Sequence, residues 1–250
     1  MQRYFIGFDQ ALNDQIWITG EDAHHIARVM RMKAGDHLIA VLPDGSSSQC
    51  EIQQIEETRV MAKANGWKQE VKELPIKVAI GSGLPKGDKL EWIIQKGTEL
   101  GASTFIPFNA ARSIVKWDPK KSEKKLVRWE KIAKEAAEQS HRTTVPGITP
   151  PIEFKQLLEI GRNYRVKVIA YEEEAKHGQS SKFASILDKM SPGDSILAIF
   201  GPEGGLTAQE VSLLEENGFV AVGLGPRILR TETAPLYVLS AISYHFELMR

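Results

Sequence analysis

The stretch ILAIFGPEGG, residues 196–205, contains the pattern that decides the fold: an apolar run followed directly by a glycine-rich loop. A second example, VAVGLGPRILRTETA, occupies residues 220–234. We expect each loop to open into a helix. A strand, a loop of bare backbone and a helix, in that order, build small-molecule sites at the carboxyl ends of strands in α/β proteins. Two such loops predict one ligand held between them.

Composition limits the class of protein. The chain has 250 residues, which suits one large domain or, as we expect, two. Hydrophobic residues make up 42%, enough for a real core, and 32 basic residues balance 32 acidic ones. The whole-chain charge therefore does not indicate a nucleic-acid partner, although a local basic face stays open.

Cysteine count and targeting signals predict a compartment. The single cysteine, Cys50, excludes an internal disulfide and a cysteine-based metal cluster, and it fits a reducing cytoplasm. The first residues lack a signal-peptide core, and no apolar run is long enough to span a bilayer. We therefore expect a soluble, cytoplasmic protein.

Residues 1 to about 70 are predicted to be rich in β-structure. One helix, Glu21–Met32, interrupts a series of short strands, and closely spaced strands without long helices favour a small barrel. The expected strands are Arg3–Ile6, Gln15–Thr19, His37–Leu42, Cys50–Glu56 and Arg59–Ala64. The polar segment Trp67–Leu74 is predicted to be a linker.

Beyond this linker, strands and helices alternate, which predicts a parallel sheet. The expected strands are Ile76–Ile80, Thr104–Phe108, Val166–Tyr171, Ser195–Phe200 and Val220–Leu224. Helices are predicted over Lys89–Leu100 and Lys124–Ser140, and the basic face of the second is expected to be solvated. A third begins after Thr207, which forms a capping-box pattern with Glu210.

The last helix is expected to begin near Thr233 and to be apolar around most of its circumference. Its apolar residues are Leu236, Val238, Leu239, Ala241, Ile242, Tyr244 and Phe246. A helix of this kind is buried on more than one side, and a homodimer interface is a natural second side for a terminal helix.

The glycines of the first loop have two interpretations. They can let a ligand approach the backbone, or they can merely form a tight turn. A phosphate-binding P-loop would need G-x-x-x-x-G-K-[ST], which the sequence lacks. Gly81–Gly87 resembles a variant dinucleotide fingerprint, but the next strand ends in Phe108–Asn109, without an acidic residue for a ribose hydroxyl. The two C-terminal loops remain the favoured site.

These loops carry a resemblance to a known family. Gly201–Gly205 and Leu224–Ala234 resemble ribosomal RNA small subunit methyltransferase E, in the SPOUT class of S-adenosylmethionine-dependent RNA methyltransferases. The similarity covers effectively the whole chain. It includes Arg3–Phe5, His24–Asp36, Lys96–Gly101 and Glu135–Arg142.

The resemblance implies an α/β fold in two domains. Residues 1–70 would form a PUA-like, RNA-binding β-barrel, and residues 74–250 a SPOUT methyltransferase domain with a parallel sheet and a deep trefoil knot, which binds the cofactor and dimerises. The implied cofactor is S-adenosylmethionine, without a metal. The implied reaction is methylation of N3 of a specific uridine in 16S rRNA of the assembled small ribosomal subunit, by a homodimer with no membrane partner.

The resemblance also assigns residues to the cofactor and to the chemistry. Those expected to bind the cofactor are Tyr171, Phe200, Gly201, Pro202, Glu203, Gly204, Gly205, Leu224, Gly225, Arg227, Ile228, Leu229, Arg230, Thr233 and Ala234. Arg230 is hypothesised to stabilise the anion formed when N3 loses its proton, and Glu232 to act as a base or to orient Arg230. An ion pair of Glu232 with Arg230 or Arg227 that only fixes the loop is the competing interpretation.

RNA phosphates are expected to be contacted from both domains, although solvated surface charge is the alternative for each residue. The candidates are Arg3, Arg28, Arg31, Lys86, Lys89, Arg112 and Lys116. His24–His25 are expected to be ordinary barrel residues and Glu172–Glu174 an exposed acidic turn. Two other classes of function stay open: a non-catalytic RNA- or ribosome-binding protein and a nicotinamide oxidoreductase.

Overall fold

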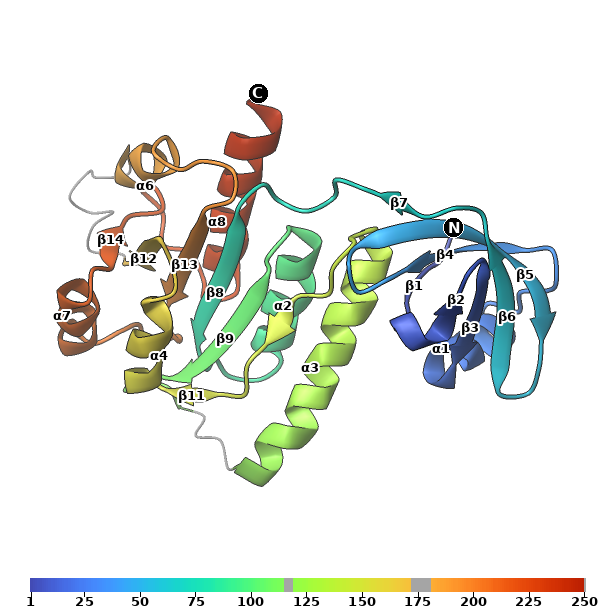
Figure 1. Cartoon of the computed structure of the whole chain (residues 1–250). Helices are drawn as coiled ribbons and strands as arrows, with labels where there is room; N and C mark the ends of the chain where they lie inside the picture. Colours follow the sequence, from blue (N-terminus) through green and yellow to red (C-terminus); the bar gives the residue numbers. More distant parts are fainter. Residues whose placement is uncertain (115–118, 172–180, 250) are drawn as a thin grey trace. The chain divides into compact units, whose positions relative to one another are not determined.

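The computed structural model describes residues 1–114, 119–171 and 181–249, and most of its helices and strands are labelled in Figure 1. The chain divides into two compact units. The first contains residues 1–73 and 137–144, and the second contains residues 74–136 and 145–250. The segment 137–144, which the sequence placed in the second domain, therefore lies with the N-terminal unit.

The N-terminal unit is built on a mixed sheet with the strand order β1-β4-β5-β6-β3-β2, and β7 pairs with β5. The strands are β1 (Arg3–Phe5), β2 (Ala11–Leu12), β3 (Gln15–Thr19), β4 (His37–Val41), β5 (Ser46–Ile55), β6 (Arg59–Ala64) and β7 (Lys68–Gln69). The helical segments are η1 (Phe8–Gln10), α1 (Gly20–His24) and η2 (His25–Val29), the last a π-helical turn. Only β1 and β4 pair in parallel.

Buried and exposed side chains alternate along these strands, and the buried ones form the core of the unit. In β5 the side chains of Cys50 and Ile52 are buried while Glu51 is exposed. Successive side chains on a strand point to opposite faces of the sheet, so apolar residues at every second position form one buried face. The predicted helix Glu21–Met32 is shorter than expected: it ends at Val29, the last residue of η2, and Arg31, with a φ of +53°, is outside the helical conformation.

A buried ion network fastens the segment 137–144 to the rest of this unit. Arg142, 3% exposed, pairs with Glu73, which also accepts the backbone N–H groups of Thr143 and Thr144 at 2.9 and 3.1 Å. Arg3 is 2% exposed, donates to the Arg142 carbonyl at 2.9 Å and pairs with Glu70 at 2.9 Å. The burial of Arg3 and the bonds that its Nη1 and Nη2 atoms make within this unit argue against the predicted contact with RNA.

Replacing Glu73 with glutamine should destabilise the N-terminal unit by about 2 kcal/mol, because it removes a carboxylate that pairs with the buried Arg142. Burial alone would raise the pKa of Glu73, but the bonds from Arg142 and the neighbouring backbone lower it below the ordinary 4.5. The stabilisation by the Glu73 carboxylate should be fully present above pH 4.5 and should disappear as the pH falls through the lowered pKa of Glu73. Urea unfolding across pH measures this.

Glu56→Gln is the matched control, since Glu56 forms an exposed pair with Arg59 at 2.6 Å. It should leave the unfolding free energy unchanged, as exposed ion pairs contribute little. Equal effects of the two substitutions would contradict a special role for the buried network.

The C-terminal unit is built on a parallel sheet with the order β10-β9-β8-β13-β12-β14, and β11 pairs with β9. The strands are β8 (Lys77–Gly83), β9 (Thr104–Asn109), β10 (Gly147–Ile148), β11 (Ile152–Glu153), β12 (Val166–Ala170), β13 (Ser195–Phe200) and β14 (Val220–Val222). The helices are α2 (Lys89–Glu99), α3 (Pro119–Gln139), α4 (Phe154–Gly161), α6 (Ser181–Leu187), α7 (Ala208–Glu216) and α8 (Thr233–Ser243), continued by the π-helical turn η3 (Tyr244–Leu248).

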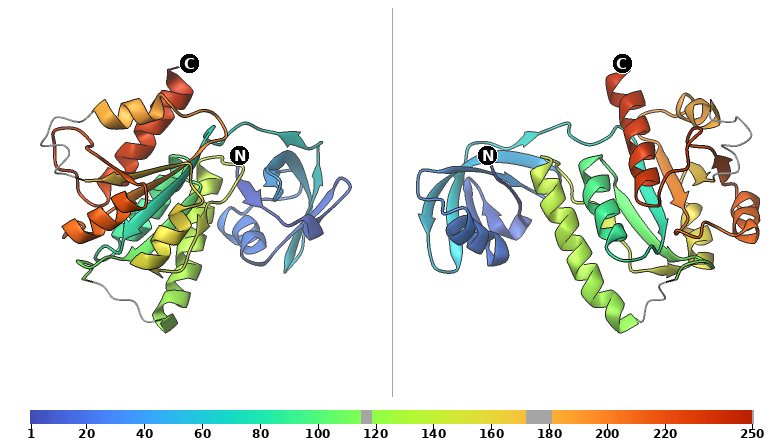
Figure 2. Two further views of the ribbon diagram at one scale, coloured as in Figure 1. Left: turned by 60° about the vertical axis from the view of Figure 1, so that its left-hand side comes forward. Right: turned by 180° about the vertical axis from the view of Figure 1, so that it is seen from behind.

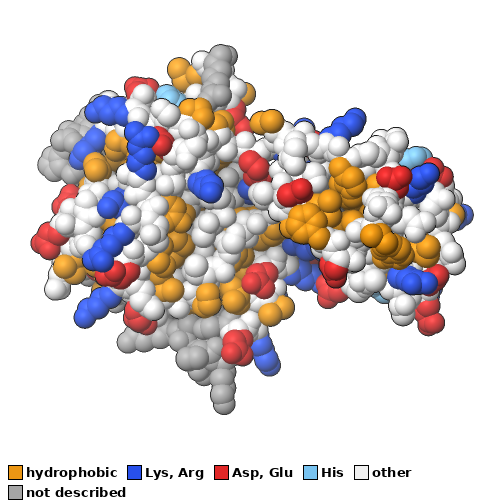
Figure 3. Space-filling view, in the orientation of Figure 1, with side chains coloured by type: hydrophobic (Ala, Val, Ile, Leu, Met, Phe, Trp, Pro, Cys, Tyr) orange, Lys and Arg blue, Asp and Glu red, His pale blue; other side chains and the backbone are white. Residues whose placement is uncertain are grey.

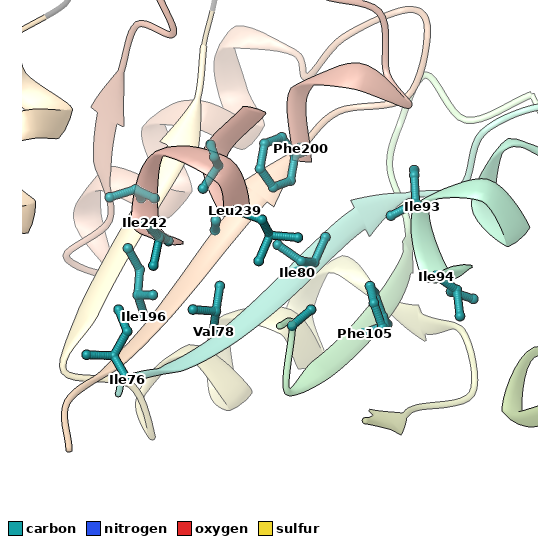
Figure 4. Close-up of a cluster of buried hydrophobic side chains, with 14 of the residues drawn as sticks. Ile76, Val78, Ile80, Ile93, Ile94, Phe105, Ile196, Phe200, Leu239 and Ile242 are labelled. Atoms are coloured by element: carbon teal, nitrogen blue, oxygen red, sulfur yellow. The ribbon is translucent and has the colours of Figure 1, made fainter. Parts of the chain in front are cut away.

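Helices cover both faces of this sheet (Figure 2). On one face Val78, Ile80 and Phe200 pack with side chains of α2, α3, α6 and α8, and Figure 4 shows part of this cluster. On the other face Leu197 and Ile199 pack with α4 and α7. The strands are apolar on both sides because a parallel sheet carries its crossover helices on its two faces.

Gly81 and Gly83 lie inside strand β8, which extends three residues beyond the predicted end. A Cβ on Gly81 would stand 2.4 Å from Ile199 Cδ1, and one on Gly83 would stand 2.9 Å from the Pro202 nitrogen. These glycines therefore permit close strand packing. The dinucleotide interpretation of Gly81–Gly87 is wrong, because its first two glycines belong to a strand rather than to a phosphate-binding loop.

Candidate functional site

A pocket of about 700 Å³ lies at the carboxyl ends of β12 and β13. Its walls come from both glycine-containing segments noted in the sequence, and from α2 and the segment after β9. The lining residues are Lys89, Arg112, Ala170, Tyr171, Phe200, Gly201, Pro202, Glu203, Gly204, Gly205, Leu206, Ala208, Ile228, Leu229, Arg230, Thr231 and Ala234.

The first loop, Gly201–Gly205, is tightly folded on itself. A Cβ on Gly201 would stand 2.9 Å from the Gly205 carbonyl carbon and 2.9 Å from the Leu206 nitrogen. Gly205 has a φ of +69°, and a Cβ there would meet nothing within 4 Å. Gly201 therefore serves the shape of the loop, whereas Gly205 leaves open space in the wall of the pocket.

The helix after this loop starts as predicted and also holds a neighbouring segment. The capping box is confirmed: the Glu210 N–H donates to Thr207 Oγ1 at 3.2 Å, and the Thr207 N–H donates to Glu210 Oε2 at 2.8 Å. Glu210 Oε1 accepts the N–H of Ala111 at 2.8 Å. Arg112 donates to the Gly204 carbonyl at 2.9 Å. The segment after β9 is thus bonded to the first loop and its helix.

Lys89 links three segments of the chain beside the pocket through two glutamates, of which Glu203 lines the pocket and Glu232 does not. Lys89 Nζ lies 2.9 Å from Glu203 Oε1 and 3.4 Å from Glu232 Oε2. Glu203 also accepts the N–H of Lys86 at 3.2 Å. Burial would raise the pKa of Glu203, but the bond from Lys89 and those from backbone N–H groups outweigh it and lower that pKa. The carboxylate form of Glu203 is favoured.

The second loop brings Ile228, Leu229, Arg230 and Thr231 to the pocket. Ile228 is 77% exposed, so its apolar side chain is available to a ligand. Within the described residues, neither Arg230 nor Arg227 pairs with Glu232, whose ion pair is with Lys89. The competing interpretation of a loop-fixing arginine–Glu232 pair is therefore wrong, and Arg230 is among the residues that line the pocket.

Most of the residues expected to bind a cofactor do line this pocket, but four do not. Leu224 packs against the hydrophobic core, Gly225 forms a turn with φ +92°, Thr233 donates its N–H to the Arg230 carbonyl at 2.9 Å, and Arg227 is exposed. Sequence reasoning missed three lining residues that flank the predicted segments, Ala170, Leu206 and Ala208, and it left Thr231, inside the second loop, without an individual assignment. Their position beside a strand end or glycine loop was the available signal.

The residues expected to contact RNA occupy different environments. Arg28, Arg31 and Lys86 are exposed, whereas Lys89 and Arg112 line the pocket and bind other parts of its wall. Lys116 and Glu172–Glu174 lie outside the described residues. In Figure 3, basic and acidic side chains are interspersed over the visible face. Charge alone therefore does not mark an RNA-binding surface there.

Other expectations concern histidines and the basic helix. His25 Nδ1 lies 3.0 Å from the hydroxyl of the buried Tyr4, so its ring belongs to the packing of the N-terminal unit. On α3, Lys125 and Arg128 pair with Glu91 of α2 at 3.4 and 2.7 Å. Part of the basic face predicted to be solvated thus bonds α3 to α2.

None of the described helices is both long and apolar enough to cross a membrane. No described group of three or more His, Cys, Asp or Glu side chains is arranged to hold a metal ion.

Comparison with protein-family models defines the class. Residues 72–243 match an RNA methyltransferase domain, and residues 18–63 match an RNA methyltransferase PUA domain. Both parts of the chain thus have counterparts among RNA methyltransferases, and the matched C-terminal region contains the pocket.

Individual relatives identify the family within that class. The chain is 55% identical to ribosomal RNA small subunit methyltransferase E of Bacillus subtilis, covering 100% of this chain and 99% of the relative. It is 34% identical to the Synechocystis protein of the same name, over 96% and 77% of the two chains. A crystal structure of the Neisseria gonorrhoeae enzyme bound to S-adenosyl methionine superposes with a TM-score of 0.83 at 28% identity, covering 97% of both chains. The chain belongs to the ribosomal RNA small subunit methyltransferase E family.

Substituting Gly201 by alanine should distort the first loop, since the added Cβ would stand 2.9 Å from backbone atoms that cannot turn away. We expect a loss of about 2 kcal/mol in unfolding free energy and at least tenfold weaker binding of S-adenosylmethionine, an estimate of about 1.4 kcal/mol. Gly147→Ala is the control, because a Cβ there meets nothing within 4 Å. Urea unfolding and calorimetry measure both effects, and wild-type values for Gly201→Ala would contradict the loop's dependence on bare backbone.

Proposed function

We propose that this protein transfers a methyl group from S-adenosylmethionine to N3 of a specific uridine in 16S rRNA, acting on the assembled small ribosomal subunit in the cytoplasm. The observation that carries the proposal is the pocket, whose wall joins the glycine loop to Ile228, Leu229 and Arg230. Family membership supports the class of reaction. A deep trefoil knot in the C-terminal unit and a closed PUA-like barrel in the N-terminal unit belong to the same proposal.

The pocket fits the proposed cofactor. Its volume of about 700 Å³ lies within the range of small-molecule sites, and its lining combines apolar side chains with polar and charged groups that can fix the orientation of a ligand. Phe200, Leu206 and Ile228 supply apolar surface, and Gly205 leaves open space where any other residue would place a Cβ. We assign the adenosyl portion to the surface formed by these residues.

S-adenosylmethionine bound there would supply an activated methyl group on a sulfonium, so the protein's task is to position the acceptor. Uridine N3 carries a weakly acidic proton that must leave before or during attack. Arg230 has no recorded ion pair among the described residues, and its cation would stabilise the uracil anion. Glu232, beside Lys89, would accept the proton or orient the base.

The assay uses purified small ribosomal subunits from a strain lacking this protein, with S-adenosylmethionine carrying a labelled methyl group. We expect one labelled nucleotide in 16S rRNA, identified by mass spectrometry as N3-methyluridine. Arg230→Ala should lower the turnover number about 100-fold with both substrates saturating, the cost of losing one stabilising group for a developing anion.

Arg227→Ala is the matched control, because Arg227 is exposed on the same segment but does not line the pocket. Near-normal turnover by Arg230→Ala would contradict the assignment of Arg230 as the group that stabilises the uracil anion. Binding of S-adenosylmethionine and subunits by the wild type without methyl transfer would instead indicate a non-catalytic ribosome-binding protein.

We also infer that two copies associate through α8 and the π-helical turn η3 that continues it. Val238, Leu239 and Ile242 are buried in the C-terminal unit, whereas Tyr237, 42% exposed, and Tyr244, 57% exposed, lie on another side of the helix. Leu248 is 72% exposed in the turn that follows. An apolar surface of this kind is typical of an interface, and a second copy of the chain would bury it.

Introducing a charge by Tyr244→Glu should prevent this association, since an unpaired carboxylate cannot be buried without a large cost. Light scattering after size-exclusion chromatography should give a mass near twice 27.9 kDa for the wild type and near 27.9 kDa for the variant. Val127→Glu, at an apolar position on α3 that is 66% exposed, should remain dimeric. A monomeric wild type would contradict the inference.

A further inference from the structure

Lys89 occupies the first position of α2, and its side chain reaches the pocket. Its ammonium is 2.9 Å from Glu203 of the first loop and 3.4 Å from Glu232, the residue before α8. Those two carboxylates belong to segments that follow different strands, β13 and β14. One cation thus joins three segments of the chain at the proposed reaction site.

The two carboxylates depend on Lys89 to different degrees. Glu203 also accepts the Lys86 N–H, at 3.2 Å to one oxygen and 3.4 Å to the other, so it is held without Lys89. Glu232 Oε2 is buried and has no hydrogen bond among the described residues, and the cation recorded beside it is Lys89. A buried carboxylate oxygen without a partner is costly, so Lys89 is the contact that compensates Glu232.

This arrangement leaves Lys89 poorly suited to bind RNA phosphate. It lies between two negative charges and is only about one-third exposed. The ion pair with Glu203 raises its pKa, burial opposes this, and the charges of both carboxylates add to the increase, so Lys89 remains a cation. Moving it onto a phosphate would leave the Glu232 oxygen uncompensated.

We propose that Lys89 is a positioning residue for methyl transfer: it fastens Glu232 to Glu203 and thereby fixes the Glu232 carboxylate relative to the pocket. The proposal rests on the proposed function in one respect, namely that Glu232 acts on the target uridine. Lys89 itself touches neither the uridine nor the methyl group in this account. Its effect should therefore appear in turnover rather than in cofactor affinity.

The kinetic test compares Lys89→Met and Lys89→Arg with the wild type, using small ribosomal subunits and S-adenosylmethionine. Lys89→Met should lower kcat at least about tenfold, because a small misplacement of a reacting group is sufficient for such a loss. The KM for subunits and the Kd for S-adenosylmethionine should stay within about threefold. Lys89→Arg restores a cation between the carboxylates and should recover part of the loss.

A double-mutant cycle with Glu232→Gln identifies the group through which Lys89 acts. If Lys89 acts by holding the Glu232 carboxylate, Lys89→Met should cost little further kcat in the Glu232→Gln protein. Lys96→Met is the matched control, because Lys96 lies on the same helix and pairs with Glu99 at 2.8 Å, but does not line the pocket. It should leave kcat and KM unchanged.

Three kinetic outcomes would overturn the proposal: an undiminished kcat in Lys89→Met, an equal loss in both backgrounds of the cycle, or a change confined to the KM for subunits. The last would make Lys89 an RNA contact. Crystal structures of the wild type and Lys89→Met give a readout that needs no activity. The Glu232 carboxylate should move away from Glu203 in the variant, and an unmoved carboxylate would overturn the proposal even if the wild type transferred no methyl group.

Discussion

The close approach of the chain at the carboxyl ends of β8 and β13 is the constraint on which the site depends. The two strands pair in parallel from Lys77 to Ser82, so their ends meet at one edge of the sheet. The first loop can begin there only because Gly83 has no side chain, since a Cβ would stand 2.6 Å from Pro202. Gly201 then lets the loop fold back on itself. Bare backbone at these positions creates the wall of the pocket.

Polar contacts connect this wall of the pocket to segments that follow other strands of the sheet. Arg112 binds the Gly204 carbonyl, Glu210 binds the Ala111 N–H, and Lys89 bridges Glu203 and Glu232. Each contact joins segments that follow different strands. Several side chains that look like surface charge in the sequence are therefore occupied in holding the pocket together, which leaves Arg230 as a cation at the pocket without a recorded ion pair among the described residues.

Prediction from sequence worked best where one local rule governs an element. β3, β6 and β13 have the expected bounds, because each is an apolar or alternating run between clear turn signals. Two-residue strands such as β7 and β10 were not predicted, since they exist only through pairing with a partner strand. For the pocket, the glycine loop and the segment 228–231 could be predicted, but the contributions of Ala170 and Lys89 could not.

The sequence by itself determined the order of strands, loops and helices along the chain, the two loops predicted to hold a ligand, and the family to which they point. Local patterns suffice for these because capping, alternation and glycine placement act within a few residues. Only the tertiary structure decided the partners of the charges. It buried Arg3 against Glu70, placed Gly83 inside a strand, and paired Glu232 with Lys89 rather than with an arginine of its own loop. Charge pairing depends on distances across the fold, and residues 143 positions apart in the chain, as Lys89 and Glu232 are, carry no local signature of their contact.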